Sequence, residues 1–585
     1  PILLLHHNHP AAPQTRDHKM VSSIYESADS SFWLGTLSGL VKFNRETGNY
    51  ESYPHHYEIF RYGWGLTEEI AEDHSGFLWL ATPGELMRFN PTALKYDYFR
   101  NDPYDFNSIS YNVVSSVFID KTGILWVGTS GQGLNIYDPR SNRFSTMVRE
   151  KDETSRISGF SIRSILEDSN GIVWVGSDVL YRWDRLKNEL KSYETSSSTP
   201  DDFGNTGPWS MIEDSEGTIW TATSEGVYNY NPATEKTRQY KFSPENLSGL
   251  PEKDVYTVFE DQQKNIWAIT EYYLCKLTGR ENGIFEHTLR LPIAESSKTP
   301  RTVIYQDKQN IFWIGTRDGL IRYNEKTSSV EVIKKNTTVN TGLNNDLIKS
   351  ICPDPFEPDN FLWIGTGGGG LNRIDKKKNT IEYITETEGL PNNVVYGILP
   401  DTSGNLWLST NKGLSKYNIL NGTFRNFDVK DGLQSNEFNT GAFFSSKTGE
   451  LFFGGIKGLN YFRPEQIQNN PHKPNVVLTR LIVDGKPVQY TSENSVLQKP
   501  VSETKHFQLS HKKDIITFLF AALDYSAPEK NQYRYRLENF NDSWINPAPA
   551  RRATYTNLPP GEYIFHVKAS NNDGIWNHEG AKINF

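Results

Sequence analysis

The sequence predicts an all-β protein: a β-propeller (a seven-bladed ring plus blades of a second, incomplete propeller) followed by an immunoglobulin- or fibronectin-like β-sandwich. Three observations lead to this prediction. Short runs that alternate apolar and polar residues are separated by turn residues, with 44 Gly and 30 Pro among 585 residues. A tryptophan recurs at nearly constant intervals through most of the chain. The last part of the chain keeps the alternation and loses that interval.

The recurring tryptophan defines an internal repeat. Nine of the 14 tryptophans fall in one column, and the intervals between its members run from 44 to 50 residues. The column holds Trp33, Trp79, Trp126, Trp174, Trp220, Trp267, Trp313, Trp363, Trp407 and, as a substitute, Phe453. A period of this length is typical of propeller blades and other repeat arrays.

Each unit predicts four short strands. In the third unit, residues 112–120 alternate as a first strand and residues 121–123 form a tight turn. Residues 124–130, 133–139 and 143–148 supply the second, third and fourth strands. One such sheet cannot bury both of its faces, so the blades must stack face to face around an axis.

The recurring acids and glycines are predicted to be scaffold. An Asp precedes the first turn in most units, as at residues 167–168 and 213–214, and Asp side chains accept hydrogen bonds from turn amides. A residue repeated in nearly every blade is not expected to be a catalyst. The Gly two positions after the Trp, as at Gly176 and Gly315, leaves room for a close approach of neighbouring backbone.

Composition disfavours several functional classes. The net charge of −9 argues weakly against a nucleic-acid or anionic-membrane partner for this region and leaves room for a local basic pocket. Cys275 and Cys352 form no CxxC motif and are predicted to be buried free thiols. There is no apolar run of about 18 residues, and the apolar part of "PILLLHHNHP" is too short for a signal peptide. His6, His7 and His9 are expected to belong to a solvated terminus, so no metal or cofactor is predicted.

The blade motif and the tail resemble a known family. The "LWVGT" strands followed by "GL..Y" are similar to two-component-regulator propeller repeats, and the tail is similar to the triple-tyrosine domain that follows them. The tail residues that carry the resemblance are Tyr525, Tyr533, Tyr535, Trp544, Tyr555, Gly561, Tyr563 and Trp576. The combination resembles the periplasmic sensor of Bacteroidetes hybrid two-component systems. The resemblance implies a transmembrane helix, a histidine kinase and a response regulator downstream.

The expected domains are a partial first propeller at residues 1–155, a seven-bladed propeller at 156–470 and the sandwich at 471–585. Family sensors usually carry fourteen blades, whereas ten units are visible here. Three blades cannot close a ring. We expect an upstream part to be missing, and the alternative is one large ten-bladed ring. The ending "AKINF" is expected to lie inside a strand of a fragment cut before its membrane anchor.

The candidate ligand site is a column of residues near the start of the innermost strands. Propeller loops on one edge of the ring carry specificity while the blades carry stability. The column holds Arg163, Trp209, Tyr256, Thr302, Lys349, Tyr396 and Asn439, and we predict ligand binding by all of these except Thr302. Flat rings cover the apolar faces of sugars, and Arg, Lys and Asn satisfy hydroxyl or acidic groups. The alternative is that these side chains only plug the channel.

Two further loops are candidates for the same edge. Trp209 follows the polar loop 194–208, and Arg61, Tyr62 and Trp64 lie in a loop of the first propeller, which could equally pack on a neighbouring domain. In the tail, Tyr533, Tyr535 and Trp544 are predicted to form the sandwich core.

The leading hypothesis is a non-catalytic periplasmic sensor that binds an oligosaccharide and acts as a homodimer. By resemblance, it would relay binding to a membrane-linked histidine kinase that controls polysaccharide utilisation and transcription, with membrane contact only through a downstream helix. One alternative is a propeller glycosidase or polysaccharide lyase, which needs carboxylates or a base converging at one place. The acids that the repeat places lie in its turns, so no catalytic residue is predicted. The other alternative is a protein-interaction scaffold.

Overall fold

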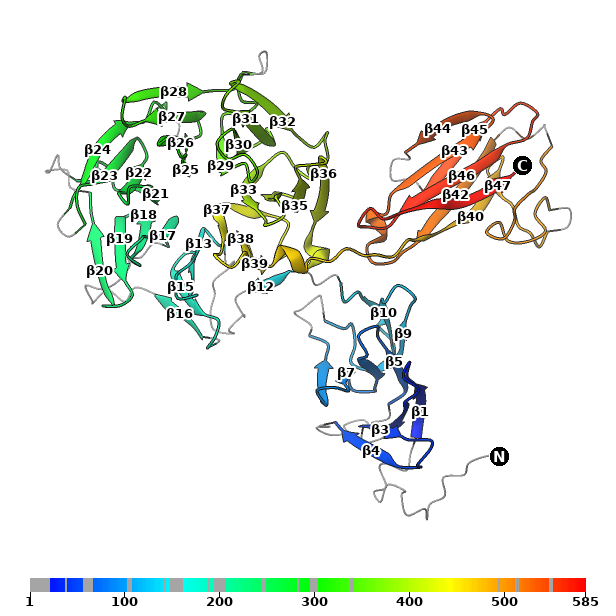
Figure 1. Ribbon diagram of the computed structural model, residues 1–585. Coiled ribbons are helices and arrows are strands. Elements are labelled where there is room, and N and C mark those ends of the chain that lie inside the picture. The colour runs from blue at the N-terminus through cyan, green and yellow to red at the C-terminus, as the bar shows by residue number, and fades with distance from the viewer. Residues whose placement is uncertain are drawn as a thin grey trace. The chain divides into compact units, whose positions relative to one another are not determined.

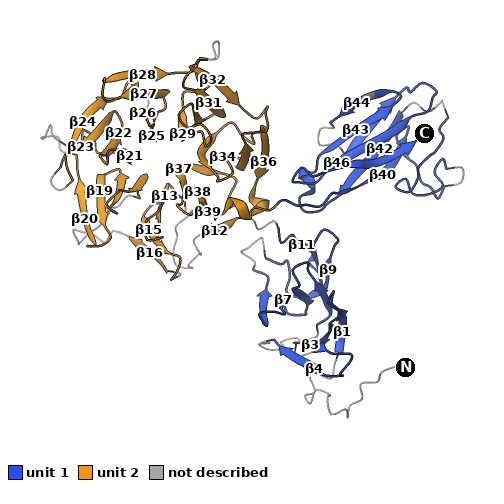
Figure 2. Ribbon diagram, viewed as in Figure 1, with its two compact units in different colours: residues 1–141, 469–585 blue, residues 142–468 orange. Residues whose placement is uncertain are grey.

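The computed structural model describes residues 21–36, 39–55, 67–102, 108–140, 144–147, 161–187, 189–193, 207–242, 249–280, 283–294, 303–336, 341–492, 495–510, 513, 515–546 and 551–585. The chain divides into two compact units, one of residues 142–468 and one that combines residues 1–141 with 469–585 (Figure 2). Across these described ranges, no helix has both the length and the apolar character needed to cross a membrane. The helical elements described are the short 3-10 turns η2 (Val429–Asp431), η3 (Pro464–Gln466) and η4 (Pro528–Lys530).

The unit of residues 142–468 is a ring of seven four-stranded antiparallel sheets (Figure 1). Six blades follow the chain in order. They are β13–β16 (Ser164–Glu167, Val173–Gly176, Leu180–Asp184, Glu189–Tyr193), β17–β20 (Ser210–Glu213, Ile219–Thr223, Gly226–Asn231, Lys236–Tyr240), β21–β24 (Val255–Glu260, Ile266–Thr270, Tyr273–Leu277, Phe285–Arg290), β25–β28 (Val303–Gln306, Ile311–Gly315, Leu320–Asn324, Ser329–Ile333), β29–β32 (Ile348–Pro353, Phe361–Thr366, Leu371–Asp375, Thr380–Ile384) and β33–β36 (Val395–Pro400, Asn405–Thr410, Gly413–Asn418, Thr423–Phe427). The first strand of each blade lies nearest the axis, and the second strands are buried almost throughout.

The seventh blade corrects the prediction for residues 143–148. Its inner strands are β37 (Phe438–Ser445), β38 (Leu451–Gly455) and β39 (Gly458–Phe462), and its outer strand is β12 (Ser145–Met147). β12 pairs antiparallel with β39, so it is not the fourth strand of the third blade. The domain prediction had placed this strand in the first propeller. A strand that precedes the first blade in the chain therefore closes the ring. Phe144, directly before this strand, is buried in an apolar cluster of the last two blades. Its ring centroid lies 5.2 Å from that of Phe427 and 4.8 Å from that of Phe462.

The repeated Asp anchors the repeated Trp, which extends the predicted turn role. In eight units an Asp Oδ2 accepts the indole N–H six to nine residues later, at 2.7 to 3.0 Å. The same carboxylate also accepts turn amides: Asp261 Oδ1 accepts the N–H groups of Gln263 and Asn265. The first unit keeps Trp33 with Ser27 in place of the Asp, and the last has Ser446 with Phe453. These acids are therefore committed to the scaffold.

The glycine after the Trp is needed for blade-to-blade packing, as predicted. A Cβ added to Gly176 would lie 2.7 Å from Pro208 O and 3.0 Å from Pro208 Cγ, both in the next blade. A real side chain does not tolerate such contacts with backbone, so a larger residue would push the two blades apart.

Both cysteines are free and buried, which confirms that prediction. Cys275 lies on β23 and Cys352 on β29. Burial raises the pKa of each thiol to about 12. Both are therefore protonated at neutral pH and have little nucleophilic character.

The other unit begins with three blades. They are β1–β4 (Val21–Glu26, Phe32–Thr36, Gly39–Phe43, Tyr50–Pro54), β5–β8 (Glu69–Glu72, Leu78–Ala81, Leu86–Asn90, Lys95–Phe99) and the three-stranded β9–β11 (Val114–Ile119, Leu125–Thr129, Gly133–Tyr137). The third blade exposes an apolar face. Phe118 is 63% exposed and Leu134 is 60% exposed, whereas the equivalent Leu180 in the ring is 2% exposed.

Substituting that face should reduce exposed apolar surface without unfolding the blade. We expect Leu134→Gln with Ile136→Gln to lower the fluorescence of a hydrophobic dye and to change the free energy of unfolding by only about 0.5 kcal/mol. Leu180→Gln is the matched control at the buried position, where we expect a loss of about 2 to 5 kcal/mol. Unchanged dye binding by the double variant would contradict this interpretation of the face.

The chain ends in a β-sandwich of two antiparallel sheets. One has the order β41-β40-β42-β45 and the other β44-β43-β46-β47. The strands are β40 (Asn475–Val483), β41 (Lys486–Pro487), β42 (Ile515–Leu523), β43 (Tyr533–Glu538), β44 (Asn541–Ile545), β45 (Arg552–Thr556), β46 (Ile564–Ser570) and β47 (Trp576–Asn584). Phe518 and Phe565 stack at 4.3 Å in the core, where Tyr533 is buried and Tyr535 packs against the cluster.

Trp544 does not belong to this core, so that part of the prediction is wrong. On β43 and β46 the core side chains alternate with residues that face outward. Trp544 contacts the outward set: its ring lies beneath Arg536 and Lys568, at 4.9 and 4.5 Å. The tail pattern alone does not reveal this, because Trp544 follows the hairpin turn that joins β43 to β44 and its register depends on that turn.

Within the unit that combines residues 1–141 with 469–585, the two chain segments are hydrogen-bonded to each other. Arg140 donates to Asn470 Oδ1 at 2.8 Å and to Ser526 Oγ at 2.9 Å. Asn470 is fully buried and donates to Asp524 and Asn572. The chain therefore leaves and re-enters this unit at one polar cluster.

Candidate functional site at the rim of the ring

The predicted column lies at the edge of the ring where the innermost strands begin, which we call the rim. In a four-stranded antiparallel blade, the turn between the second and third strands returns to the same edge. The rim is therefore built by two sets of segments, those that lead into β13, β17, β21, β25, β29, β33 and β37 and the turns that follow the second strands.

Most column residues occupy β-bulges. Val255 and Thr257 pair with consecutive residues of β22, which leaves Tyr256 unpaired between them. Lys349 and Tyr396 are bypassed in the same way on β29 and β33. Arg163 and Trp209 each donate their backbone N–H to the carbonyl opposite the next residue. A bulge re-aims a side chain without ending the strand, so the column is set apart from the regular blade pattern.

Trp209 and Tyr256 form an aromatic pair from neighbouring blades. Their ring centroids are 4.8 Å apart and the planes differ by 18°, which is a stacked arrangement. Trp209 is half-buried and Tyr256 is 6% exposed, so the indole is the more accessible surface. Tyr256 donates to Asp254 Oδ2 at 3.4 Å. Burial, with Asp254 nearby, raises the pKa of Tyr256, which keeps it a neutral phenol.

Arg163, on the blade before that of Trp209, is held by an acid on the other set of rim segments. Its guanidinium donates to Asp178 Oδ1 at 2.8 Å. The Arg163 side chain is 33% exposed and the Asp178 side chain 62% exposed. Asp178 lies in the turn between β14 and β15. The rim thus presents a cation, an anion and an aromatic surface at consecutive blades.

Lys349 and Tyr396 form a second pair across neighbouring blades. The ammonium lies 5.8 Å from the Tyr396 ring centroid. Tyr396 donates to Asn411 Oδ1 at 2.6 Å, and Asn411 lies in the turn between β34 and β35. Burial raises the pKa of Tyr396, so this phenol is also neutral.

Asn439 joins the last blade to the first. Its amide donates to Ser161 Oγ at 3.0 Å and to Ile162 O at 2.8 Å. β37 carries extra residues between Phe438 and Phe443, and within them a Cβ added to Gly441 would lie 3.5 Å from Arg163 O. Both amide hydrogens of Asn439 are used, so its Oδ1 is the atom left for a ligand. The hydrogen bonds of Asn439 to Ser161 and Ile162 connect the last blade to the segment that leads into the first.

Sequence reasoning missed three polar residues around the column. Asp178, Asp254 and Asn411 each contact a column residue. Asp254 directly precedes β21, whereas Asp178 and Asn411 lie in turns after second strands. For these two the signal was present, because the turn after each second strand must return to the rim. Thr302, residues 194–206 of the polar loop, and Arg61, Tyr62 and Trp64 lie outside the described residues.

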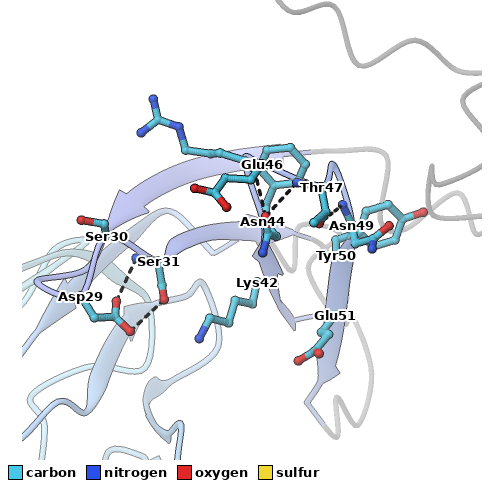
Figure 3. A pocket seen from close by; sticks show the side chains of 12 residues that line it. Asp29, Ser30, Ser31, Lys42, Asn44, Glu46, Thr47, Asn49, Tyr50 and Glu51 are labelled. Carbon is cyan, nitrogen blue, oxygen red and sulfur yellow. Dashed lines mark hydrogen bonds between the residues drawn. The ribbon is translucent and has the colours of Figure 1, made fainter.

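An open cavity of about 790 Å³ lies on the blade β1–β4, in the unit that does not contain the column (Figure 3). Its polar atoms serve their own turns: Asp29 accepts from Ser31, and Asn44 Oδ1 accepts from Glu46 and Thr47. These hydrogen bonds also lower the pKa of Asp29. We therefore favour the rim. In the part of the chain that the structure describes, no group of three or more His, Cys, Asp or Glu side chains could hold a metal ion.

Two family models match segments of the chain. The model of the two component regulator propeller matches residues 108–131, 156–178 and 389–412, and that of the Y_Y_Y domain matches residues 524–585. These segments are therefore similar to the propeller repeats and to the terminal domain that the sequence predicted, in the predicted order.

Two particular proteins are similar to this chain over most of its length. "Histidine kinase P4" of Formosa agariphila is 26% identical over 479 residues, which cover 81% of this chain and 31% of that protein. The extracellular domain of the putative hybrid two component system BT3049 from B. thetaiotaomicron has a TM-score of 0.74 and 24% identity, covering 96% of this chain and 72% of that one. The chain thus spans under a third of the curated relative's length.

Proposed function

We propose that this chain is the extracytoplasmic, periplasmic ligand-sensing region of a hybrid two-component signalling protein, and that an oligosaccharide binds at the rim. The observation that carries the proposal is the stacked Trp209–Tyr256 pair together with the Arg163–Asp178 ion pair of the neighbouring blade. An accessible indole face suits the C–H face of a sugar ring, and an ion pair beside it offers both donors and acceptors to hydroxyl groups. A related histidine kinase supports the signalling role.

Signal relay by this region requires a ligand that binds two arrangements with different affinity. We propose that two copies of the chain form a homodimer and that the Y_Y_Y domains relay the ligand-favoured arrangement toward a membrane-linked kinase controlling polysaccharide utilisation. This region itself is proposed to be non-enzymatic. Asp178 is committed to Arg163 and Asp254 to Tyr256, so neither is poised as the free carboxylate pair that glycoside hydrolysis needs.

Removing the indole should weaken binding of the sugar. We expect Trp209→Ala to weaken oligosaccharide binding by at least about tenfold in calorimetry, because most binding energy at such sites rests on a few aromatic side chains. The probes are mixed oligosaccharides from neutral and uronate polysaccharides, first ranked by thermal shift of the purified chain.

Trp183→Ala is the matched control. Trp183 is a half-buried tryptophan of the first ring blade near the opposite edge, where it contacts Tyr461. We expect the Trp183→Ala variant to bind the oligosaccharides as tightly as the unaltered chain. Equal loss in both variants, or product release from the polysaccharides by the unaltered chain, would overturn the rim proposal in favour of a structural or enzymatic role.

A further inference from the structure

The outward face of the sandwich sheet β44-β43-β46-β47 gathers positive charge. Core residues on these strands alternate with Arg534 and Arg536 on β43, His566 and Lys568 on β46 and Lys582 on β47. We call these five residues the basic face. Arg534 pairs directly with Lys568 across the strands, and His566 lies between Arg536 and Lys582.

This clustering of positive charge lowers the stability of the folded sheet, and a bound anion would offset that cost. Like charges directly opposite each other in a sheet are destabilising. Glu538 is the acid that pairs with this face, through Arg536 at 2.6 Å and, at 3.9 Å, His566. Arg534, Lys568 and Lys582 have no acid within ion-pair distance in the described ranges. The face therefore keeps an excess of positive charge although the whole chain carries −9.

Two buried nitrogen atoms of the face have no hydrogen-bond partner among the described residues. They are Arg536 Nε and His566 Nδ1. His566 is 4% exposed, and its Nε2 is bonded to Glu579 O at 2.9 Å. Burial lowers the pKa of His566, and the charges of Lys582, Lys568 and Arg536 add to that effect. A buried polar atom without a hydrogen bond costs free energy, so the face is under local polar strain as well as charge repulsion.

Aromatic rings hold the cations in place. Arg536 and Lys568 both lie over the Trp544 ring, and Arg534 lies over Trp576 at 4.8 Å. Trp544 also meets His566 edge to face at 5.0 Å. A guanidinium stacked on an indole keeps its N–H edges free for a planar anionic group. The cations are thus preorganised, which reduces the entropy lost on binding.

We propose that the basic face binds an extended polyanion that carries sulfate or carboxylate groups, of the acidic-polysaccharide kind. Charge complementarity identifies the occupant. A symmetric contact with a second copy would bring like charges together. A membrane surface fits less well. Trp544 and Trp576 are half-buried under the cations, and neither is among the large apolar side chains that the described residues expose. The face therefore offers little apolar surface for insertion into a bilayer.

The test measures binding of fluorescent dextran sulfate and of polygalacturonate to the full chain, with neutral dextran as the uncharged probe. We expect salt-sensitive binding of the two polyanions. We expect Arg534→Gln with Lys568→Gln to weaken it by about tenfold and to flatten its dependence on salt, since two fewer ion contacts form.

Arg480→Gln with Arg552→Gln is the matched control, with the same change in charge on the opposite sheet. Arg480 and Arg552 flank Leu519 on exposed positions of β40 and β45. We expect this variant to bind like the unaltered chain. Equal weakening by both pairs, or no polyanion binding, would overturn the proposal, as would preferential binding to phosphatidylserine vesicles. Trp209→Ala should leave binding of dextran sulfate unchanged, because this probe is not among the sugars proposed for the rim. Failure of the basic face is therefore distinguishable from failure of the rim proposal.

Discussion

Asp261→Ala should lower the free energy of unfolding of the seven-bladed unit by about 3 kcal/mol, because it removes several hydrogen bonds to one buried charge. Asp261 is 4% exposed and accepts the Trp267 indole N–H at 2.8 Å as well as the N–H groups of Gln263 and Asn265. Trp267 is fully buried, so its indole N–H would be left without an acceptor. Urea denaturation followed by circular dichroism measures the change.

A double-mutant cycle separates the indole bond from the turn bonds. Trp267→Phe removes the donor, and we expect the double variant with Asp261→Ala to cost clearly less than the sum of the two single changes. The chain contains its own precedent, since the last blade has Ser446 and Phe453 at these positions. Strict additivity would show that the Asp and the Trp stabilise the blade independently. An exposed acid, Asp359→Ala, serves as the control for loss of charge.

Phe144→Ala should destabilise the same unit by about 3 to 5 kcal/mol, because it removes a buried aromatic ring from the seam that closes the propeller. Phe144 is 2% exposed and packs edge-on against Phe427 and Phe462. β12 has only three paired residues, Ser145 to Met147, so packing of Phe144 supplies much of what keeps it on β39. Thermal denaturation measures the loss.

Hydrogen exchange distinguishes opening of the ring from simple loss of core. We expect Phe144→Ala to expose amides of β39 to exchange, because the edge of that strand loses its partner. Phe285→Ala is the control. Phe285 is equally buried, at 1% exposure, and lies on β24, the outer strand of a blade whose four strands are consecutive in the chain. It should lower stability while leaving β39 protected. Protection of β39 in both variants would contradict the closing role of β12.

Much of the scaffold follows from the sequence because its causes are local. A Trp column with a period of 44 to 50 residues, a turn Asp in most units and a small residue two positions after most of the Trp residues specify a blade, and blades must stack. The positions of Arg163, Trp209 and Tyr256 at the start of inner strands follow from the same register. The bulges that re-aim them do not, because a bulge leaves no fixed residue pattern.

What the sequence determined by itself was therefore the repeat, the number of units, the sandwich and the residues that face the rim. Tertiary structure alone decided three things: that β12 closes the ring, that Asp178 meets Arg163, and that Trp544 faces out beneath Arg536 and Lys568. Each depends on which segments meet in space after the blades or sheets have packed. A pairing between β12 and β39, more than 300 residues apart in the chain, is selected by the apolar site it fills rather than by any pattern within its own three residues.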